Sequence, residues 1–546
     1  MISFILLLII IFNLRTIRLH GHVTTRSQFS GLWGPMSSGH FIFISMECRR
    51  RSLHPSIHCK RIVNNVGTVL FLKIPKAVPF AFEKKKGFTT HEELLTFINK
   101  LQSEHPEIVS IKYIGSSQKG KQIPMVLFDK MKRSDSNSKV WIQGGLHGNE
   151  PASTEGVLYL MDRLLNDNQY TYLLDDLHLA FVPMANIDGY EKHDRYAANG
   201  LDLNRDQTKL MAPESVVLKQ AFSDFGAEVA LDFHEYRSYR KDLSQLRDYG
   251  VAARYDVMFL YSGNLNVPEN IRSYTQQVFV KNAVDMLFEN GLKTHDYVTP
   301  VKIFGDLHFN QGSSNARSSA TSYALTNSVS SLIEVRGVGL GRTSFKRRVN
   351  ATFLVGLSYL QTTVANQADL KAEIRSAIEA QQAATVISKK KRVNQTIEVI
   401  DLDTEEEVLL DITVHDALQS TPELQRTRPT AYVILATEVM LIEKLKVLGQ
   451  KLEELTEEQS IEIEKYIVTE YTRDAAKYEG VHRQNVKTEI KNSSKVFPKG
   501  TYLLYLDQPK ANLAIEVLEP EADNSFVSFN VLPTNEGDEL PVCRYL

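Results

Sequence analysis

The chain has 546 residues, of which 43% are hydrophobic and 23% charged, and its formal net charge is −2. These values are ordinary for a globular protein of several domains, and the near-neutral charge gives no bulk electrostatic case for nucleic acid or an acidic membrane as a partner. The three cysteines, Cys48, Cys59 and Cys543, include no C-x-x-C pair, which excludes a disulfide scaffold and a cysteine-based metal site.

The N-terminus carries a candidate targeting segment. Residues 2–12 are almost entirely apolar, and this run is shorter than the roughly 20 residues needed to span a bilayer. Such a run is typical of a signal-peptide core, so we expect a signal-peptide-like segment over residues 1–25, a secreted or periplasmic protein, and no stable membrane span after signal removal. Residues 26–80 show no clear periodicity, and we assign them no structure.

A globular part begins near residue 81. Thr90 and Glu93 form a capping box, and the apolar residues that follow recur at helical spacing as far as His105. Further apolar runs predict strands at residues 108–113, 123–128, 140–143, 177–183 and 228–233, and a helix at 154–165. Strands that alternate with helices imply an α/β fold in which helices cover both faces of a mixed sheet.

His147 and Glu150 follow the strand predicted at 140–143. At the end of a strand, an imidazole and a carboxylate three residues apart can point the same way and hold a zinc ion, leaving room for a third ligand and a water. The alternative is a solvated histidine and a glutamate favoured by the helix dipole. The residues downstream favour the metal site.

The segment from residue 186 to 206 is rich in glycine and asparagine and carries two arginines. Arg195, Asn204 and Arg205 offer two guanidinium groups and an amide, and arginine binds carboxylates through a planar fork that stays charged. We interpret them as a receptor for a substrate with a free acid terminus. The alternative is a loop held by internal pairs, such as Arg205 with Asp202 or Asp206.

His234 ends the strand predicted at 228–233. Because ligands bind at the carboxyl ends of strands in open α/β sheets, His234 is the candidate third metal ligand. Glu235 is an alternative carboxylate ligand, but adjacent residues of an extended chain point to opposite sides, and we prefer Glu150. A histidine that caps a surface strand is the structural alternative.

Glu334 lies in an otherwise apolar strand around residues 331–336. An ionised carboxylate is costly to bury, so such a glutamate needs a role or a partner. Beside a metal-bound water it would take a proton at neutral pH and later donate it to a leaving amine. An ion pair with Arg336 on the same side of the strand is the alternative.

A helix over about residues 350–381 is expected to close a catalytic domain at residues 81–385. The composition shifts after the basic run at 389–392. Predicted strands at 396–401, 408–414, 431–435 and 502–506, with a helix at 438–448, then give a smaller C-terminal α/β or β-rich domain at residues 395–546. Its sequence has no cluster of metal ligands, so we expect an accessory role.

In their order along the chain, these segments resemble the M14 family of zinc carboxypeptidases, the carboxypeptidase A family. The resemblance covers about residues 88 to 365 and rests on His147 with Glu150, Asn186-Ile187-Asp188-Gly189, the run from Arg195 to Arg205, His234 and Glu334. It implies one zinc ion per chain, held by His147, Glu150 and His234 with a water in the fourth position.

The resemblance also assigns roles to the other residues. Asn204 and Arg205 match the pair that binds the terminal carboxylate, Arg195 the arginine that polarises the scissile carbonyl, and Glu334 the general base and acid. The expected activity is hydrolysis of C-terminal peptide bonds by a zinc-activated water, on a peptide or protein with a free C-terminus. Two alternatives stay open: an M14-type deacylase or cell-wall peptide amidase, and a noncatalytic zinc- or peptide-binding protein.

One departure from the family pattern lies upstream of Glu334. The family commonly places a mobile tyrosine there, whereas this chain has Asn310-Gln311-Gly312-Ser313-Ser314. Tyr323 is interpreted as a packing residue, and His308 is a candidate to close over the substrate. The specificity pocket is expected within residues 308–323, where Arg317 would favour acidic side chains if it faces inward.

Overall fold

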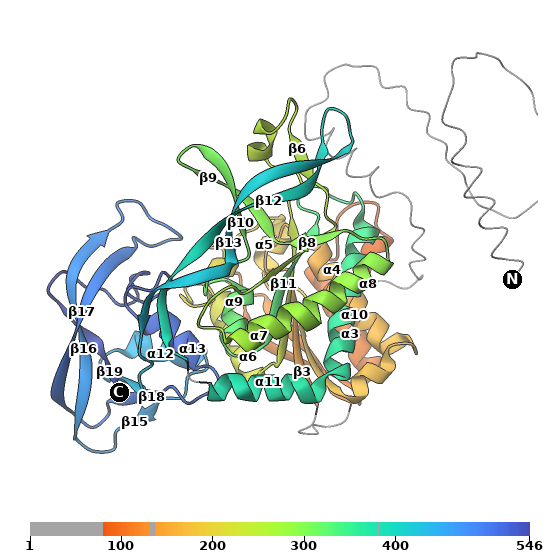
Figure 1. The fold of residues 1–546 in the computed structure, drawn as a ribbon. Helices are drawn as coiled ribbons and strands as arrows, with labels where there is room; N and C mark the ends of the chain where they lie inside the picture. The colour runs from red at the N-terminus through yellow and green to blue at the C-terminus, as the bar shows by residue number, and fades with distance from the viewer. Residues whose placement is uncertain (1–79, 131–136, 381) are drawn as a thin grey trace, which may run out of the picture. The chain divides into compact units, whose positions relative to one another are not determined.

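The larger part of the fold is built on an eight-stranded mixed sheet (Figure 1). The computed structural model describes residues 80–130, 137–380 and 382–546, so the expected signal-like segment lies outside the described residues. Four strands at the centre, β4, β3, β5 and β11, are parallel. In sheet order the strands are β1 (Val109–Ser116), β2 (Gln122–Phe128), β4 (Leu177–Val182), β3 (Ser138–Gly144), β5 (Val229–Tyr236), β11 (Val329–Arg336), β7 (Val257–Tyr261) and β8 (Thr294–Asp296).

Helices cover both faces of this sheet, which confirms the predicted α/β class. Trp141 of β3 packs edge-on against Phe222 of α6, with ring centroids 5.6 Å apart, whereas Gly144, three residues along the strand, lies against Ser153 of α4 on the other face. The helices are α4 (Pro151–Asn166) and α10 (Phe345–Ala365) on one face, and α6 (Pro213–Phe225) and α9 (Ser319–Ala324) on the other. Further helices are α3 (His91–Glu104), α5 (Ile187–Lys192), α7 (Glu269–Tyr274), α8 (Lys281–Glu289) and α11 (Gln367–Glu379).

Two local predictions can be compared directly with the structure. The capping box is confirmed: the Glu93 amide donates to the Thr90 hydroxyl at 3.3 Å, and the Thr90 amide donates to the Glu93 carboxylate at 2.7 Å. The single helix predicted over residues 350–381 is wrong. Two helices, α10 and α11, meet at Asn366, whose side chain donates to the Thr362 carbonyl at 2.8 Å, a local hydrogen bond that competes with helix continuation.

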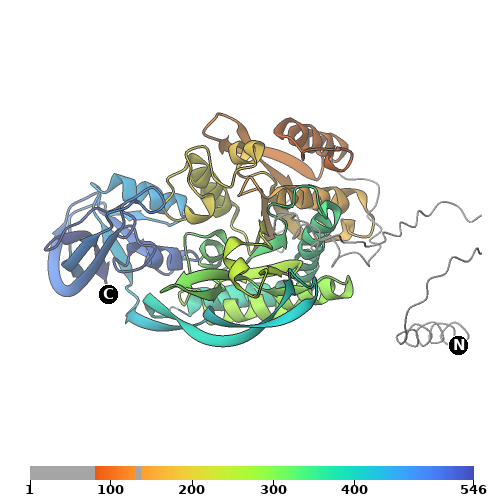
Figure 2. The same ribbon diagram turned by 90° about the horizontal axis from the view of Figure 1, so that it is seen from above.

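A five-stranded sheet lies beside the larger part. Its strands, in order, are β6 (Val251–Ala253), β12 (Ala384–Asp401), β13 (Glu407–Arg426), β10 (Asp306–Gln311) and β9 (Val298–Ile303). β12 and β13 form a long antiparallel hairpin, and β13 runs parallel to β10. Figure 2 shows this hairpin, in cyan, on the opposite side of the larger part from α3, in orange. Segments before residue 385 and after residue 395 therefore share one sheet.

The C-terminal part is β-rich, as predicted. Its six-stranded sheet runs in the order β15 (Glu453–Glu454), β18 (Tyr502–Tyr505), β14 (Ala431–Ile434), β19 (Glu539–Tyr545), β16 (Gln459–Arg473) and β17 (Gln484–Phe497), packed with α12 (Val439–Val447) and α13 (Ala511–Leu518). The carboxylate of Glu516 on α13 accepts hydrogen bonds from the side chains of Asn264 and Asn266, each at 2.7 Å, and so joins the two parts. Within the described ranges, no helix has the length and apolar character needed to cross a membrane.

Candidate active site

The turn between β3 and α4 fixes His147 and Glu150. Glu150 precedes α4 directly, with Pro151 opening the helix. A Cβ at Gly148 would lie 2.0 Å from the carbonyl carbon of Gly189 and 2.1 Å from the amide nitrogen of Tyr190, so only glycine lets this turn pack against α5. The turn therefore holds both candidate ligands in a buried position, with His147 3% and Glu150 2% exposed.

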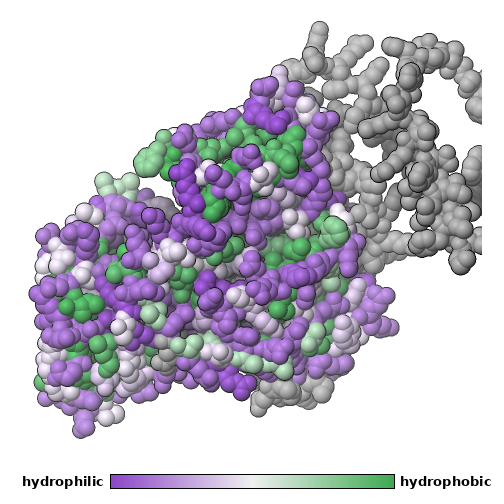
Figure 3. Space-filling model, in the orientation of Figure 1, coloured by the Kyte–Doolittle hydropathy of each residue, from purple (hydrophilic) through white to green (hydrophobic). Residues whose placement is uncertain are grey.

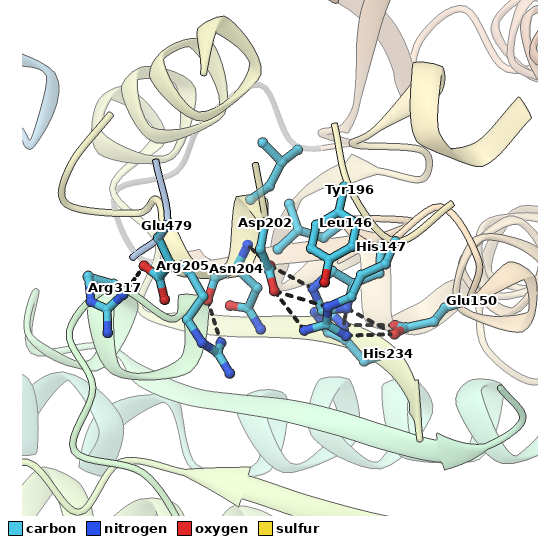
Figure 4. A network of polar contacts seen from close by, with 12 residues as sticks. Leu146, His147, Glu150, Tyr196, Asp202, Asn204, Arg205, His234, Arg317 and Glu479 are labelled. Carbon is cyan, nitrogen blue, oxygen red and sulfur yellow. Dashed lines mark hydrogen bonds and ion pairs between the residues drawn. The ribbon is translucent and has the colours of Figure 1, made fainter. Parts of the chain in front are cut away.

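His234 meets this pair at the carboxyl ends of β3 and β5 (Figure 4). The Nδ1 atoms of His147 and His234 are 2.9 Å apart. One oxygen of Glu150 lies 2.9 Å from Nδ1 of His147, and the other lies 2.9 Å from Nδ1 of His234. Two imidazole nitrogens and a carboxylate thus converge on one point, where each offers a ligand atom to a metal ion.

Two aspartates fix which ring nitrogen of each histidine faces that point. Nε2 of His147 lies 3.0 Å from Asp202, and Nε2 of His234 lies 2.9 Å from Asp232. A carboxylate is an acceptor, so each Nε2 can donate its proton to its aspartate and leave the lone pair of Nδ1 for a metal ion. Two imidazole nitrogens and a carboxylate in this arrangement make a donor set that fits zinc.

The charges at this point also favour a cation. Burial disfavours a charged imidazole, but Asp232 and Glu150 outweigh burial and raise the pKa of His234 well above its ordinary value. Burial likewise opposes ionisation of Glu150, yet His147 and His234 hold its pKa well below the usual range. The carboxylates at the site therefore stabilise positive charge.

Arg195 lies beside the three donors and is held by Asp202. Its Nε and one terminal nitrogen donate to Asp202 at 3.0 and 2.9 Å, and its other terminal nitrogen lies 3.7 Å from Glu150. The ion pair with Asp202, which was the alternative interpretation for Arg205, is thus formed by Arg195 instead. The Arg195 side chain is about one-third exposed and lines the neighbouring cavity.

Asn204 and Arg205 lie in the short 3-10 helix η3 (Leu203–Arg205), capped by Asp202. The Asn204 side-chain oxygen accepts the backbone amide of Ser319 at 2.8 Å, which turns the amide nitrogen of that side chain away from α9. Arg205 donates to the carbonyl of Asn204 at 2.6 Å. Asp206 instead accepts the backbone amides of Met211 and Ala212, so the expected alternative pair of Arg205 with Asp206 is not formed.

Glu334 stands opposite His234 in the register between β11 and β5. Burial and the nearby charge of Glu150 raise the pKa of Glu334 to about 7, although His234 and His147 lower it. Arg336, the alternative partner, donates to Asp256 at 2.9 Å. Glu334 is therefore placed at the cavity wall beside the three donors with a pKa suited to proton exchange at neutral pH.

Glu235 is occupied elsewhere. Its carboxylate accepts Nε of Arg348 at 2.6 Å and the backbone amide of Ala152 at 3.1 Å, and it is absent from the converging donor set. Its backbone amide donates to Glu150 at 3.0 Å, which orients that carboxylate. Glu150 rather than Glu235 thus faces the two histidines, as the alternation of side chains along the strand predicts.

The sequence interpretation overlooked Tyr297. It lines the same cavity as Glu150, Arg195 and Glu334, and burial and the charge of Glu334 raise its pKa to about 12. Tyr323 is a packing residue, stacked on Phe222 with ring centroids 4.0 Å apart.

The prediction that His308 closes over the substrate is wrong. Its Nδ1 lies 3.0 Å from Nε2 of His415, and its neighbour Phe309, which points the other way, lines the cavity.

Arg317 does not offer a free charge for acidic substrates. It pairs with Glu479 of the C-terminal part (Figure 4), and its Nε donates to Asn524 at 2.9 Å. Lys209 donates to the same oxygen of Glu479 at 2.8 Å. The C-terminal part thus neutralises the cation that the sequence placed in the specificity region.

The chain is similar to known zinc carboxypeptidases. The sequence profile of the zinc carboxypeptidase family matches residues 94–233, a range that includes His147 and Glu150 and ends one residue before His234. "Carboxypeptidase 2" of Trichophyton rubrum is 30% identical over 471 residues, covering 84% of this chain and 87% of that protein. "Carboxypeptidase 2" of Trichophyton equinum is 30% identical over 485 residues, covering 86% and 89%. Among solved structures, a metallo-carboxypeptidase from Burkholderia cenocepacia aligns with 50% of this chain and 69% of its own, at 16% identity and a TM-score of 0.40.

The chain belongs to the M14 family of zinc carboxypeptidases and is a metallocarboxypeptidase. Its match to the Trichophyton proteins extends well beyond the profile match.

Proposed function

We propose that this metallocarboxypeptidase removes the C-terminal residue of peptides or proteins, with one zinc ion held by His147, Glu150 and His234. The observation that carries the proposal is the convergence of the two Nδ1 atoms and the Glu150 carboxylate, with both Nε2 atoms turned to aspartates. A zinc ion bound there would lower the pKa of a water ligand and polarise the substrate carbonyl.

Glu334 is proposed as the general base and acid. Its position at the cavity wall lets it take a proton from water and return it to the amine of the leaving residue. A carboxyl with a pKa near the working pH can do both, since it is neither too weak a base nor too weak an acid.

Arg195, Asn204 and Arg205 are proposed to bind two groups of the substrate, the scissile carbonyl and the terminal carboxylate. Arg195, held by Asp202, would donate to the carbonyl oxygen as negative charge develops on it. Asn204 and Arg205 would bind the terminal carboxylate, because a guanidinium and an amide supply several donors to one acid group. This clamp predicts that substrates with a blocked C-terminus are poor.

A paired-substrate assay tests the proposal. Wild-type protein should hydrolyse acetyl-dipeptides with a free carboxylate and leave the corresponding amides almost untouched. Arg205→Ala should reduce kcat/KM for the free acid at least tenfold, the scale of a lost charged hydrogen bond, and should remove most of the preference for acid over amide. Equal turnover of acid and amide by wild-type protein would favour an amidase or deacylase, and zinc binding without turnover would favour a noncatalytic binding protein.

A further inference from the structure

A cavity of about 420 Å³ opens from the proposed catalytic groups toward the five-stranded sheet. Glu150, Arg195 and Glu334 line one end, and residues of β6, β10, β12 and β13 line the other. We infer that this cavity binds the side chain of the residue that precedes the scissile bond and that it selects large apolar side chains. The inference rests on the proposed function and names the substrate class for it.

The position of the cavity sets which substrate residue it receives. Arg195 and Glu334 line it, whereas Asn204 and Arg205, the proposed carboxylate clamp, do not. Tyr236, two residues beyond His234, continues the wall away from the metal ligands. With the terminal carboxylate at the clamp and the scissile carbonyl at the metal, the substrate chain before that carbonyl runs into the cavity.

The far end of the cavity is apolar. Ile397 and Val399 alternate along β12 and so share one face, which they present to the cavity together with Leu410 of β13 and Phe309 of β10. Val399 is 3% and Phe309 4% exposed. Pockets of about 300 to 1,000 Å³ hold small organic ligands, so the volume suffices for a phenylalanine or leucine side chain.

Charged residues also line the cavity, among them Arg237, Lys241 and Glu398, of which Glu398 pairs with Arg254. Arg240 donates to Asp242 at 3.2 and 2.9 Å, so this pair neutralises itself. Burial of a large apolar side chain against the apolar wall would be favourable, since it removes apolar surface of both from water. The discrimination should be for large apolar over small side chains.

The roof of the cavity comes from the hairpin of β12 and β13, far in sequence from the ligands. Leu410 faces the cavity, and its neighbour Leu409 lies on the outer face of the same strand, 68% exposed. The outside of the molecule around this sheet mixes polar and apolar residues (Figure 3). These adjacent leucines give a matched pair of positions, one inside the cavity and one outside.

The test compares acetyl-Phe-Ala with acetyl-Gly-Ala, so that the released residue is constant. We expect wild-type kcat/KM to be at least tenfold higher for the phenylalanine peptide, the scale on which an apolar pocket discriminates. Leu410→Gln should reduce that ratio severalfold. Leu409→Gln, with the same substitution on the outer face, should keep the wild-type ratio, and both variants should melt within a few degrees of wild type.

Binding to Glu334→Gln separates this inference from the proposed function. This variant should bind acetyl-Phe-Ala more tightly than acetyl-Gly-Ala by the same factor, as measured by calorimetry, whether or not the wild-type protein turns either over. Turnover of both peptides at equal rates, with equal binding, would overturn the apolar subsite and leave the carboxypeptidase proposal intact. Preferential binding without turnover in wild-type protein would support the subsite and overturn the proposed catalysis.

Discussion

Asp232→Asn tests how the site selects the Nδ1 atom of His234 for the metal. Asp232 is 1% exposed, and its carboxylate lies 2.9 Å from Nε2 of His234. An asparagine in this place either accepts the Nε2 proton as a neutral group or turns its amide nitrogen toward the ring. The second orientation moves the ring proton to Nδ1, where it blocks the metal.

The expected effect of Asp232→Asn is a 10- to 100-fold loss of zinc affinity, which corresponds to about 1.4 to 2.7 kcal/mol. Competition with a chromophoric chelator measures this dissociation constant directly. Asp188→Asn is the matched control, because Asp188 is equally buried but accepts from the Ser117 hydroxyl at 3.0 Å and the Lys119 amide at 3.1 Å. An unchanged affinity in Asp232→Asn, or an equal loss in Asp188→Asn, would refute the orienting role.

Gly148, Glu334 and Glu516 can each be tested by a single substitution. Gly148→Ala should lower zinc affinity at least tenfold and the free energy of unfolding by about 1 to 3 kcal/mol, because its Cβ would meet the backbone of Gly189 at 2.0 Å. Zinc titration and thermal melting measure the two effects. A variant with wild-type zinc affinity and stability would contradict the packing of this turn against α5. Glu334→Gln should keep its zinc and lose roughly 10²- to 10⁴-fold in kcat. Wild-type kcat/KM should fall as pH drops through the pKa of Glu334, which is about 7 before zinc offsets the charge of Glu150. A kcat/KM that stays constant at acid pH would contradict the role of Glu334 as general base. Burial raises the folded-state pKa of Glu516 from 4.5 to about 7. The stabilisation of the fold by protonated Glu516 is therefore complete below pH 4.5 and is lost as pH rises through 7, by roughly 3 kcal/mol at most. The apparent Tm should fall between pH 5 and pH 8, and it should fall less in Glu516→Gln.

Much of the site could be predicted because its signals are local. His147 with Glu150 is a short spacing at a strand end, and Glu334 is a costly charge in an apolar strand. Asp232 also had a local signal, since residues two apart on a strand share a face with His234. The double role of Asp202 had none, because its contact with His147 spans 55 residues and depends on the path of the loop.

The roof of the cavity and Tyr297 depend on pairing between distant strands. β10 pairs with β13 through Phe309 and Val414, more than a hundred residues apart in sequence, and no local pattern specifies such a partner. β16 and β17 were overlooked because one face of each strand is exposed and charged, which weakens the apolar signal that marks a strand. The expected domain boundary between residues 385 and 395 fell inside β12, because the exposed and charged face of this strand likewise weakens its apolar signal.

Zinc stoichiometry tests the central claim most directly. Purified wild-type protein, analysed for metal by mass spectrometry after removal of loosely bound ions, should contain one zinc per chain. Folded Glu150→Gln and His234→Ala should contain far less, whereas Glu235→Gln, altered at the adjacent carboxylate that pairs with Arg348, should retain it. Wild-type protein without zinc, or a folded Glu150→Gln that keeps a full equivalent, would contradict the account.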